Sequence, residues 1–233
     1  MKSSLLLLAA LGSTLSAAQA QTTIGKGTGL LTGSVGYHTS TDDVTNTGSG
    51  STYTSTVTYG TFNLDVAVGG FVADNLALGL QLSHSVTGGS AKSSSNLQTT
   101  SPPTSTTLRV GPMVQYYKML SEQFGLTAGV GAGYESDLRR SVQYYTSGGY
   151  PTTYYTNLKA TGYYAALTPG IVFFPVPKFG LTATIGSLAY NRLTIKNNNL
   201  TGSNIPDETA SSFDAGFGFS QLQFGASYYF GRK

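Results

Sequence analysis

Residues 124–135 read Phe-Gly-Leu-Thr-Ala-Gly-Val-Gly-Ala-Gly-Tyr-Glu, and their alternation indicates the fold. Side chains of a β-strand point to opposite faces in turn. One face of this segment is then aliphatic with an aromatic ring at each end, and it holds Phe124, Leu126, Ala128, Val130, Ala132 and Tyr134. The other face is small and polar. An apolar centre between two aromatic ends is what one strand of a transmembrane β-barrel presents to a bilayer.

Residues 1–20 have the features of a secretory signal peptide. Lys2 supplies a positive charge, residues 5–11 form an apolar core, and Ala18-Gln19-Ala20 is a small-x-small cleavage site. The apolar core is too short for a transmembrane helix, which needs about 20 residues. We therefore expect cleavage near Ala20, which leaves residues 21–233 as one outer-membrane β-barrel domain.

The composition fits a membrane barrel and argues against other classes. Charged residues make up 10% of the chain, against about 25% in soluble domains. The mean hydropathy of −0.04 is expected when half of each strand faces a polar lumen. The net charge of +3 is small and the basic residues are scattered, so no nucleic-acid partner is expected. The absence of Cys excludes disulfide and thiolate chemistry.

Hydrophobic alternation and turn signals predict eight strands. They lie near residues 27–39, 55–72, 76–86, 106–119, 124–136, 159–174, 179–190 and 213–230. Three short connections alternate with four long ones, and the long ones are about 40–54, 87–105, 137–158 and 191–212. This alternation and an even strand number are typical of outer-membrane barrels. The predicted fold is all-β, an eight-stranded antiparallel up-and-down transmembrane β-barrel with both chain ends on the periplasmic side.

Aromatic residues gather at the short-turn ends of these strands, where a periplasmic girdle is expected. They are Phe71, Tyr116, Tyr117, Phe124, Phe173, Phe174, Phe179, Tyr228 and Phe230.

Three positions predict local irregularity. Pro112 and Pro169 lie inside strands, where the missing N–H removes a ladder hydrogen bond, so bulges are expected there. In the last strand, Phe213, Phe217 and Phe219 have the opposite parity to the outward face of residues 222–230. This switch predicts a bulge near Ser220, or a stretch that rises above the membrane.

Few charges have the parity that faces the lumen. Arg109 and Glu135 fall opposite each other across the hairpin of the fourth and fifth strands. The other inward polar residues singled out are Asp65, Gln81, Gln221 and Gln223. Eight strands leave room only for packed side chains or one small ligand. We interpret the set as a structural polar network that fills the lumen, with a gate or a polar binding site as the alternative.

The stretch 137–158 differs from the other long connections. Its centre, Ser147-Gly148-Gly149-Tyr150-Pro151, is typical of a hairpin tip. The flanking strands are expected to protrude beyond the bilayer as a tyrosine-rich ribbon. Tyr is well suited to adaptable contacts. The surface-interaction candidates are Tyr144, Tyr145, Tyr150, Tyr154 and Tyr155.

Three internal segments and the signal peptide carry a family resemblance. The segments are Gly111-Pro112-Met113-Val114-Gln115-Tyr116-Tyr117, Thr168-Pro169-Gly170-Ile171 and Gly225-Ala226-Ser227-Tyr228-Tyr229-Phe230. Together they resemble the small outer-membrane barrels of the OmpA transmembrane-domain and OmpX-like superfamily. The last segment resembles the C-terminal signal that the barrel-assembly machinery reads, although Gly231-Arg232-Lys233 follow Phe230.

This resemblance implies a place in the outer membrane of a Gram-negative bacterium. It implies contact with outer-membrane lipid and lipopolysaccharide, and the barrel-assembly machinery as a partner through the strand that ends at Phe230. An extracellular partner would bind through the loops. The resemblance does not specify an activity, because its relatives include anchors, adhesion-type proteins, small-ligand channels and lipid-modifying enzymes.

The two histidines bear on an enzymatic interpretation. His84 has lipid-facing parity and serine neighbours, as in lipid A deacylases of this architecture, but Ser85, Val86 and Thr87 do not match their His-x-Ser-Asn spacing. His38 and His84 lie on separate strands without a nearby inward carboxylate, which makes a poor metal site. No catalytic residue, metal or cofactor is therefore expected.

The leading function hypothesis is an integral outer-membrane barrel with a structural or surface-interaction, adhesion-like role and no chemistry. The alternative is a small-solute channel or transporter, because the many lumenal glycines could leave a void. A lipid A-modifying enzyme is the third hypothesis. A soluble lipocalin-like barrel is the fourth, and it is disfavoured because its outward faces would be charged rather than aliphatic.

Overall fold

The computed structural model describes residues 23–48, 51–93, 104–147, 150–197 and 208–232, and they form one antiparallel sheet. The strands are β1 (Gly29–Gly48), β2 (Ser51–Ala73), β3 (Leu76–Ser93), β4 (Thr104–Met119), β5 (Phe124–Ser147), β6 (Tyr150–Val176), β7 (Phe179–Ile185), β8 (Ser187–Asn197), β9 (Glu208–Gly216) and β10 (Leu222–Phe230). A 3-10 turn, η1 (Phe219–Gln221), precedes β10. The predicted signal peptide and its cleavage site lie outside the described residues.

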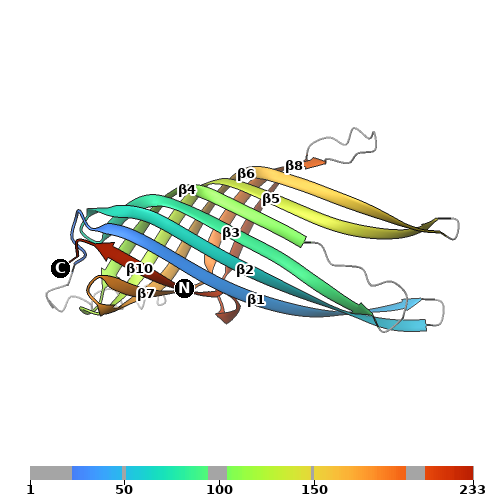
Figure 1. Cartoon of the computed structure of the whole chain (residues 1–233), viewed down its shortest axis with the longest axis horizontal. Helices are drawn as coiled ribbons and strands as arrows, with labels where there is room; N and C mark the ends of the chain where they lie inside the picture. Colours follow the sequence, from blue (N-terminus) through green and yellow to red (C-terminus); the bar gives the residue numbers. More distant parts are fainter. Residues whose placement is uncertain (1–22, 49–50, 94–103, 148–149, 198–207, 233) are drawn as a thin grey trace, which may run out of the picture.

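The sheet closes on itself because β10 pairs with β1 (Figure 1). Each strand from β1 to β6 pairs with the next along the chain, and β6 pairs with both β7 and β8. The segments β7 and β8 are two parts of one interrupted strand, as are β9 and β10. The ring therefore has eight strands, and the predicted up-and-down barrel is confirmed. Among the described residues, no helix is long and apolar enough to cross a membrane.

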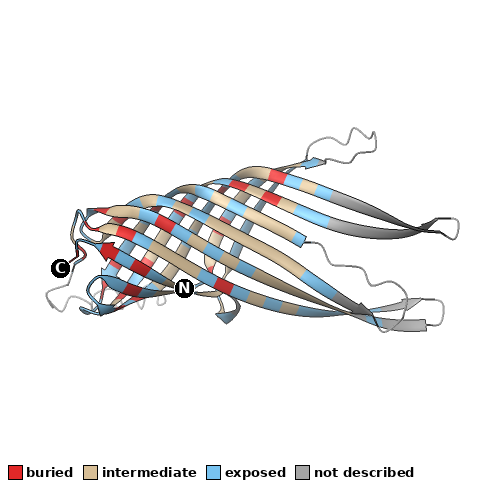
Figure 2. Cartoon of the chain, viewed as in Figure 1, coloured by how far each residue is buried: buried red, intermediate tan, exposed pale blue. Residues whose placement is uncertain are grey.

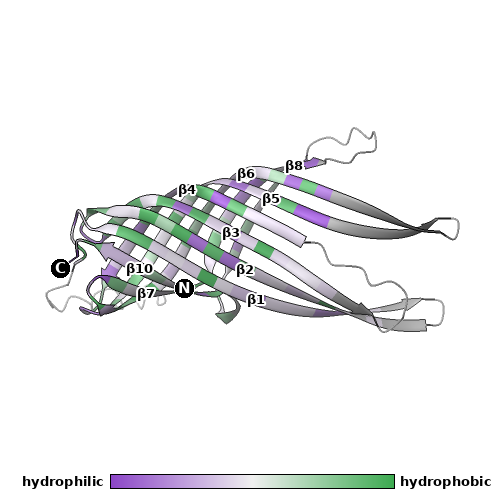
Figure 3. Cartoon of the chain, in the orientation of Figure 1, coloured by the Kyte–Doolittle hydropathy of each residue, from purple (hydrophilic) through white to green (hydrophobic). Residues whose placement is uncertain are grey.

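The outer face of the ring is apolar and exposed. Val68 on β2, Leu80 on β3 and Pro112 on β4 lie side by side in register, and Leu80 leaves 62% of its surface uncovered. Exposed leucine, valine and aromatic residues occur on the other strands as well, and hydrophobic residues recur along the strands in Figure 3. Contiguous exposed apolar surface of this extent is typical of a membrane-facing protein.

The buried core gathers at the short-turn end of the barrel rather than at its middle (Figure 2). Its largest fully buried side chains include Tyr117, Tyr229, Phe174, Ile24 and Leu30. Phe71, Tyr117 and Phe174 were expected in the aromatic girdle, and the structure corrects this assignment because all three are buried. Strand alternation explains the difference, since Tyr116 and Phe173 occupy the outward positions beside Tyr117 and Phe174. We call this core the floor.

The predicted loop 40–54 is instead strand, because these residues continue the β1–β2 hairpin. The ribbon predicted over 137–158 is confirmed as a continuation of the β5–β6 hairpin. Positions 49–50 and 148–149 lie outside the described residues. Cross-strand polar pairs hold the first extension. Asp43 accepts from Thr56 at 2.7 Å. Threonine also favours strand backbone because it is β-branched.

The proline expectations hold in part. At Pro112 the register of β4 with β3 continues without a bulge. Near Pro169 one extra residue does occur, but on the opposite strand. Leu167 pairs with Leu188 and Gly170 pairs with Thr184. Between these two pairs the chain advances by three residues along β6 and by four along β7 and β8. Gly186 takes up the additional residue with φ +90°. The predicted parity switch near Ser220 is confirmed as the turn η1.

We predict that Gly186→Ala destabilises the barrel, by about 1–3 kcal/mol, because its positive φ strains a residue with a side chain. An added Cβ would also lie 2.9 Å from the side-chain oxygen of Gln221. The measurement is the denaturant midpoint of the compact, unboiled band on a gel. Gly88→Ala is the control, because nothing lies within 4 Å of the place that its Cβ would take. Equal midpoints for the two variants would contradict the prediction.

Candidate functional site

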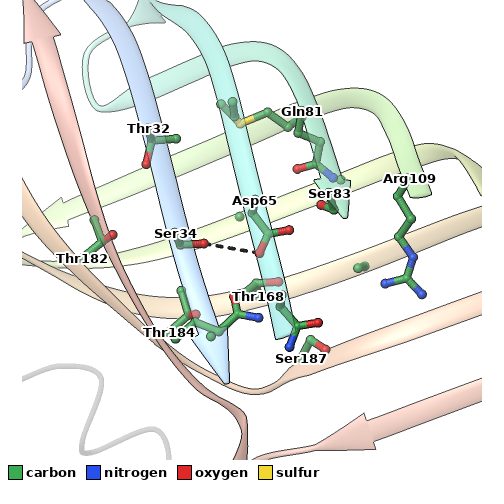
Figure 4. Close-up of a pocket in the computed structure, with 18 of the residues that line it drawn as sticks. Thr32, Ser34, Asp65, Gln81, Ser83, Arg109, Thr168, Thr182, Thr184 and Ser187 are labelled. Atoms are coloured by element: carbon green, nitrogen blue, oxygen red, sulfur yellow. Dashed lines mark hydrogen bonds between the residues drawn. The ribbon is translucent and has the colours of Figure 1, made fainter. Parts of the chain in front are cut away.

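The inward faces of the strands enclose a cavity of about 420 Å³. Hydroxyl side chains from β1, β3, β6, β7 and β8 reach its wall (Figure 4). They include Ser34, Ser83, Thr168, Thr182, Thr184 and Ser187. Short polar side chains leave this space open, whereas the floor closes it at the short-turn end. We call this cavity the cup.

Glutamine side chains in the lumen lie against glycines of other strands. A Cβ on Gly36 would come within 2.7 Å of Gln223, and a Cβ on Gly131 would overlap Gln81. Gln221 lies in the same way against Gly186 and Gly216. The expectation that lumenal glycines leave a void is therefore wrong at these positions, because they admit long amide side chains.

Arg109 and Glu135 form an ion pair across the β4–β5 hairpin. They lie directly opposite in register, and Arg109 Nε is 3.0 Å from Glu135 Oε2. Glu135 is 4% exposed. With its amide nitrogen turned inward, Asn191 donates to the same Oε2 at 3.0 Å. Glu135 is a buried carboxylate with charge-assisted partners on two sides, which offsets its loss of hydration.

The ion pair continues into a wider polar network. The guanidinium of Arg109 lies 5.2 Å from the centre of the Tyr164 ring. The hydroxyl of Tyr164 accepts a hydrogen bond of 2.9 Å from Gln81 Nε2. Strands β3, β4, β5, β6 and β8 are thus connected across the lumen. Tyr164 and Asn191 were not singled out from the sequence. The inward direction of Tyr164 follows from the outward parity of its neighbour Tyr163. Asn191 could not be assigned to a strand face, because it fell in the predicted loop 191–212.

Asp65 lies apart from this network, on β2. It accepts one hydrogen bond, from Ser34 Oγ at 3.3 Å. No ion pair to Asp65 occurs among the described residues. The six residues predicted from the sequence therefore occupy one lumen in different ways. Arg109, Glu135 and Gln81 belong to the network, Gln221 and Gln223 fill glycine gaps, and Asp65 faces the cup.

The floor is built from aromatic rings and the two described ends of the chain. Tyr229 donates to the hydroxyl of Tyr117 at 3.3 Å, and the ring of Phe71 packs at a tilt against that of Tyr117, with 5.3 Å between their centres. Arg232 lies over Phe174, 3.8 Å from the ring centre. Burial lowers the pKa of the Arg232 guanidinium from its ordinary value. The sequence did not indicate this contact, because it joins strands that are far apart along the chain.

Ile24 completes the floor at the N-terminal end. Its N–H donates to Asn75 Oδ1 at 2.8 Å, and its carbonyl accepts from the Asn75 N–H at 2.9 Å. Asn75 has φ +61°, so the β2–β3 turn is shaped to hold the incoming chain. The side chain of Ile24 is fully buried. The cup is therefore blind at this end.

The ring is open on one side above the floor. β1 pairs with β10 only from Gly29 to Val35. From Gly36 onward this edge of β1 has no strand partner in the part of the chain that the structure describes, and β9 pairs with β8 alone. We call this gap the seam. The exposed aromatic residues Tyr37, Phe217 and Phe219 lie beside it on the flanking segments.

The tyrosines predicted for surface contact lie in the β5–β6 ribbon. Their backbone is paired in register, from Ser141–Thr156 to Ser147–Tyr150. Their side chains lie outside the described residues, so Tyr144, Tyr145, Tyr150, Tyr154 and Tyr155 keep the status of predictions. Of the histidines, His84 falls beside the outward Leu64 and Leu108, and His38 lines the cup. No group of three metal-binding side chains occurs within the described ranges.

No protein family and no curated protein matches the sequence. Among solved structures, the outer membrane protein OprG from Pseudomonas aeruginosa matches at 14% identity and TM-score 0.49, over 88% of this chain and 97% of that chain. Ail, the attachment invasion locus protein of Yersinia pestis, matches at 14% identity and TM-score 0.35, over 88% of this chain and 99% of that chain. The outer membrane protease OmpT from Escherichia coli matches at 11% identity and TM-score 0.34, over 89% of this chain and 95% of that chain.

At these identities the likeness concerns the fold alone. These matches are to outer-membrane proteins, the class that the sequence was expected to resemble, and a specific relation to OmpA is not shown.

We predict that Arg109→Ala lowers the stability of the barrel by about 3–5 kcal/mol, because it leaves the buried Glu135 carboxylate without its cation. Denaturant unfolding in micelles measures this change. Arg140→Ala, an exposed arginine of β5, is the control and should cost little. The double variant Arg109→Ala/Glu135→Ala should regain part of the loss. A single variant as stable as the wild type would contradict the pairing argument.

Proposed function

We propose that this chain is an integral outer-membrane barrel that presents its β5–β6 hairpin to partners outside the cell. The observation that carries the proposal is the length of that hairpin. β5 has 24 residues and β6 has 27, whereas about 9–11 residues suffice for a tilted strand to cross a bilayer. The surplus forms a paired ribbon that extends well beyond the neighbouring strands (Figure 1).

The exposed apolar band supports insertion in a membrane. Water would disfavour a continuous ring of bare leucine, valine and aromatic side chains, while lipid tails would contact it favourably. Outer-membrane lipid and lipopolysaccharide are the proposed partners of this band. The strand that ends at Phe230 pairs with β1 and closes the ring, which supports the proposed recognition of this strand by the barrel-assembly machinery.

The orientation follows from the two ends of the barrel. Short turns, the floor and both described chain ends lie together at one end, and the hairpin ribbons project from the other (Figure 1). In outer-membrane barrels the short turns face the periplasm. The β5–β6 ribbon then faces outward, where its tyrosines could contact a protein or glycan surface. The proposal assigns the chain no catalytic role, cofactor or nucleic-acid partner.

Transport of small solutes is the second candidate, and the seam is the observation that favours it. The floor obstructs a central route, whereas the edge of β1 beyond Val35 and the outer edge of β9 have no strand partner among the described residues, and the proposed route runs between lumen and bilayer there. A solute that leaves the cup sideways would enter the membrane between Tyr37 and Phe219. Uptake of a small apolar solute by protein-containing liposomes, without ionic leak, would favour this role.

Replacing residues 141–156 with Asn-Gly should abolish adhesion of expressing cells to host-cell or matrix surfaces while the barrel still folds. Asn-Gly closes a two-residue hairpin between the paired residues Arg140 and Asn157. The control replaces residues 45–54 of the β1–β2 hairpin in the same way. A second variant changes only side chains, to Ser at Tyr144, Tyr145, Tyr150, Tyr154 and Tyr155. Adhesion that survives both β5–β6 variants would refute the proposed surface role.

The floor predicts that the purified protein shows no steady ionic current in planar bilayers. Removing its two tyrosines, which meet edge to face, in Tyr117→Ala/Tyr229→Ala, should open a path and produce a stable conductance. Tyr116→Ala is the matched control, because this neighbouring ring points outward. Gel mobility confirms that each variant is folded. A conducting wild type would show that the floor does not close the lumen.

A further inference from the structure

Asp65 is the uncompensated charge of the cup. Of the residues that line this cavity, Asp65 and Arg109 carry a formal charge at neutral pH. The charge of Arg109 is balanced by Glu135 at 3.0 Å. Asp65 has no ion-pair partner within the described ranges, and one hydrogen bond from Ser34 leaves most of its acceptor capacity free. With His38 counted as neutral, the cup and the Arg109–Glu135 pair at its wall together carry one net negative charge, that of Asp65.

The surroundings of Asp65 are rich in hydroxyl and amide groups. Ser34 on β1 and Ser83 on β3 flank it in register, and Asn63 precedes it on the same face of β2. Figure 4 shows the Asp65 carboxylate inside the cavity, between Ser34 and Ser83. Serine, threonine and asparagine can each donate and accept hydrogen bonds. Such a wall suits a solute that carries several hydroxyl groups.

The shape of the cavity limits the size of that solute. The cup holds about 420 Å³, within the range of small-molecule sites. A second cavity of about 190 Å³ shares Asn63, Asp65, Ser83, Arg109 and Gln223 with it and extends past Thr107. Since the floor closes the other end, a solute would enter and leave on the side of this second cavity or through the seam.

We propose that the cup binds a small polyhydroxylated amine of the size of an amino sugar. Its ammonium group donates to the Asp65 carboxylate, and its hydroxyl groups bond to the serine and threonine side chains around it. The single negative charge disfavours anionic solutes, and neutral polyols lack the charge-assisted bond. This site is distinct from the surface role of the ribbon and does not depend on it.

Three probes of similar size and different charge test this inference, namely glucosamine, glucose and glucuronate. Titration calorimetry on the folded full-length barrel in zwitterionic micelles should show glucosamine binding about tenfold or more tighter than glucose, with no binding of glucuronate. Asp65→Asn should remove that preference. Asp43→Asn, a carboxylate on the exposed part of β1, should leave glucosamine binding unchanged.

Ser83→Ala provides a second variant in case Asp65→Asn fails to fold, because it removes one hydroxyl beside the carboxylate with little change in volume. It should weaken glucosamine binding several-fold. Equal binding of glucosamine and glucose, no glucosamine binding at millimolar concentration, or unchanged binding by a folded Asp65→Asn variant would each overturn the proposal.

Discussion

The fold depends on one constraint, that backbone N–H and C=O groups inside a hydrocarbon layer must bond to each other. The pairing of β10 with β1 meets this constraint, since it removes the two edges that an open sheet would expose. It spans only seven residues of β1, from Gly29 to Val35. The closed part of the ring is therefore the part next to the floor. Beyond it, the edges of β1 and β9 separate, and the seam follows directly from where closure ends.

Closure creates an interior in which polar side chains must find their hydrogen-bond and ion-pair partners inside the barrel. The barrel does this with pairs drawn from different strands, as in the approach of Gln81 to Gly131 and the contact of Arg109 with Glu135. The glutamines lie against glycines and Arg109 lies against its counter-ion, so these parts of the lumen are filled by polar side chains. Where short hydroxyl side chains meet instead, around Asp65, the filling is incomplete and the cup remains. The site proposed there is thus a consequence of how the rest of the lumen is packed.

Much of this architecture could be predicted from the period-two alternation of the sequence. The alternation identified all eight strands and the outward faces, and the short hairpin between β4 and β5 placed Arg109 opposite Glu135. It failed at the strand ends. The threonine-rich extension near Asp43 has no apolar face, so alternation carries no signal there, and cross-strand hydrogen bonds hold it instead.

The break at Gly186 was also missed, because the register of β6 changes between two partner segments. The floor could not be predicted, since its contacts join β2, β4, β6 and the C-terminal residues through the closed ring.

The residues after Phe230 take their positions from the closed ring. As a sequence, Gly231-Arg232-Lys233 is a departure from a chain that ends on an aromatic residue. In the structure, Gly231 has φ +84° and turns the chain back, which places Arg232 against Phe174 and Tyr229 with 7% of its surface exposed. A desolvated guanidinium is costly unless aromatic faces or hydrogen bonds replace its water. Its position over two rings of the floor therefore argues that Gly231 and Arg232 help to seal the end of the barrel where β10 pairs with β1.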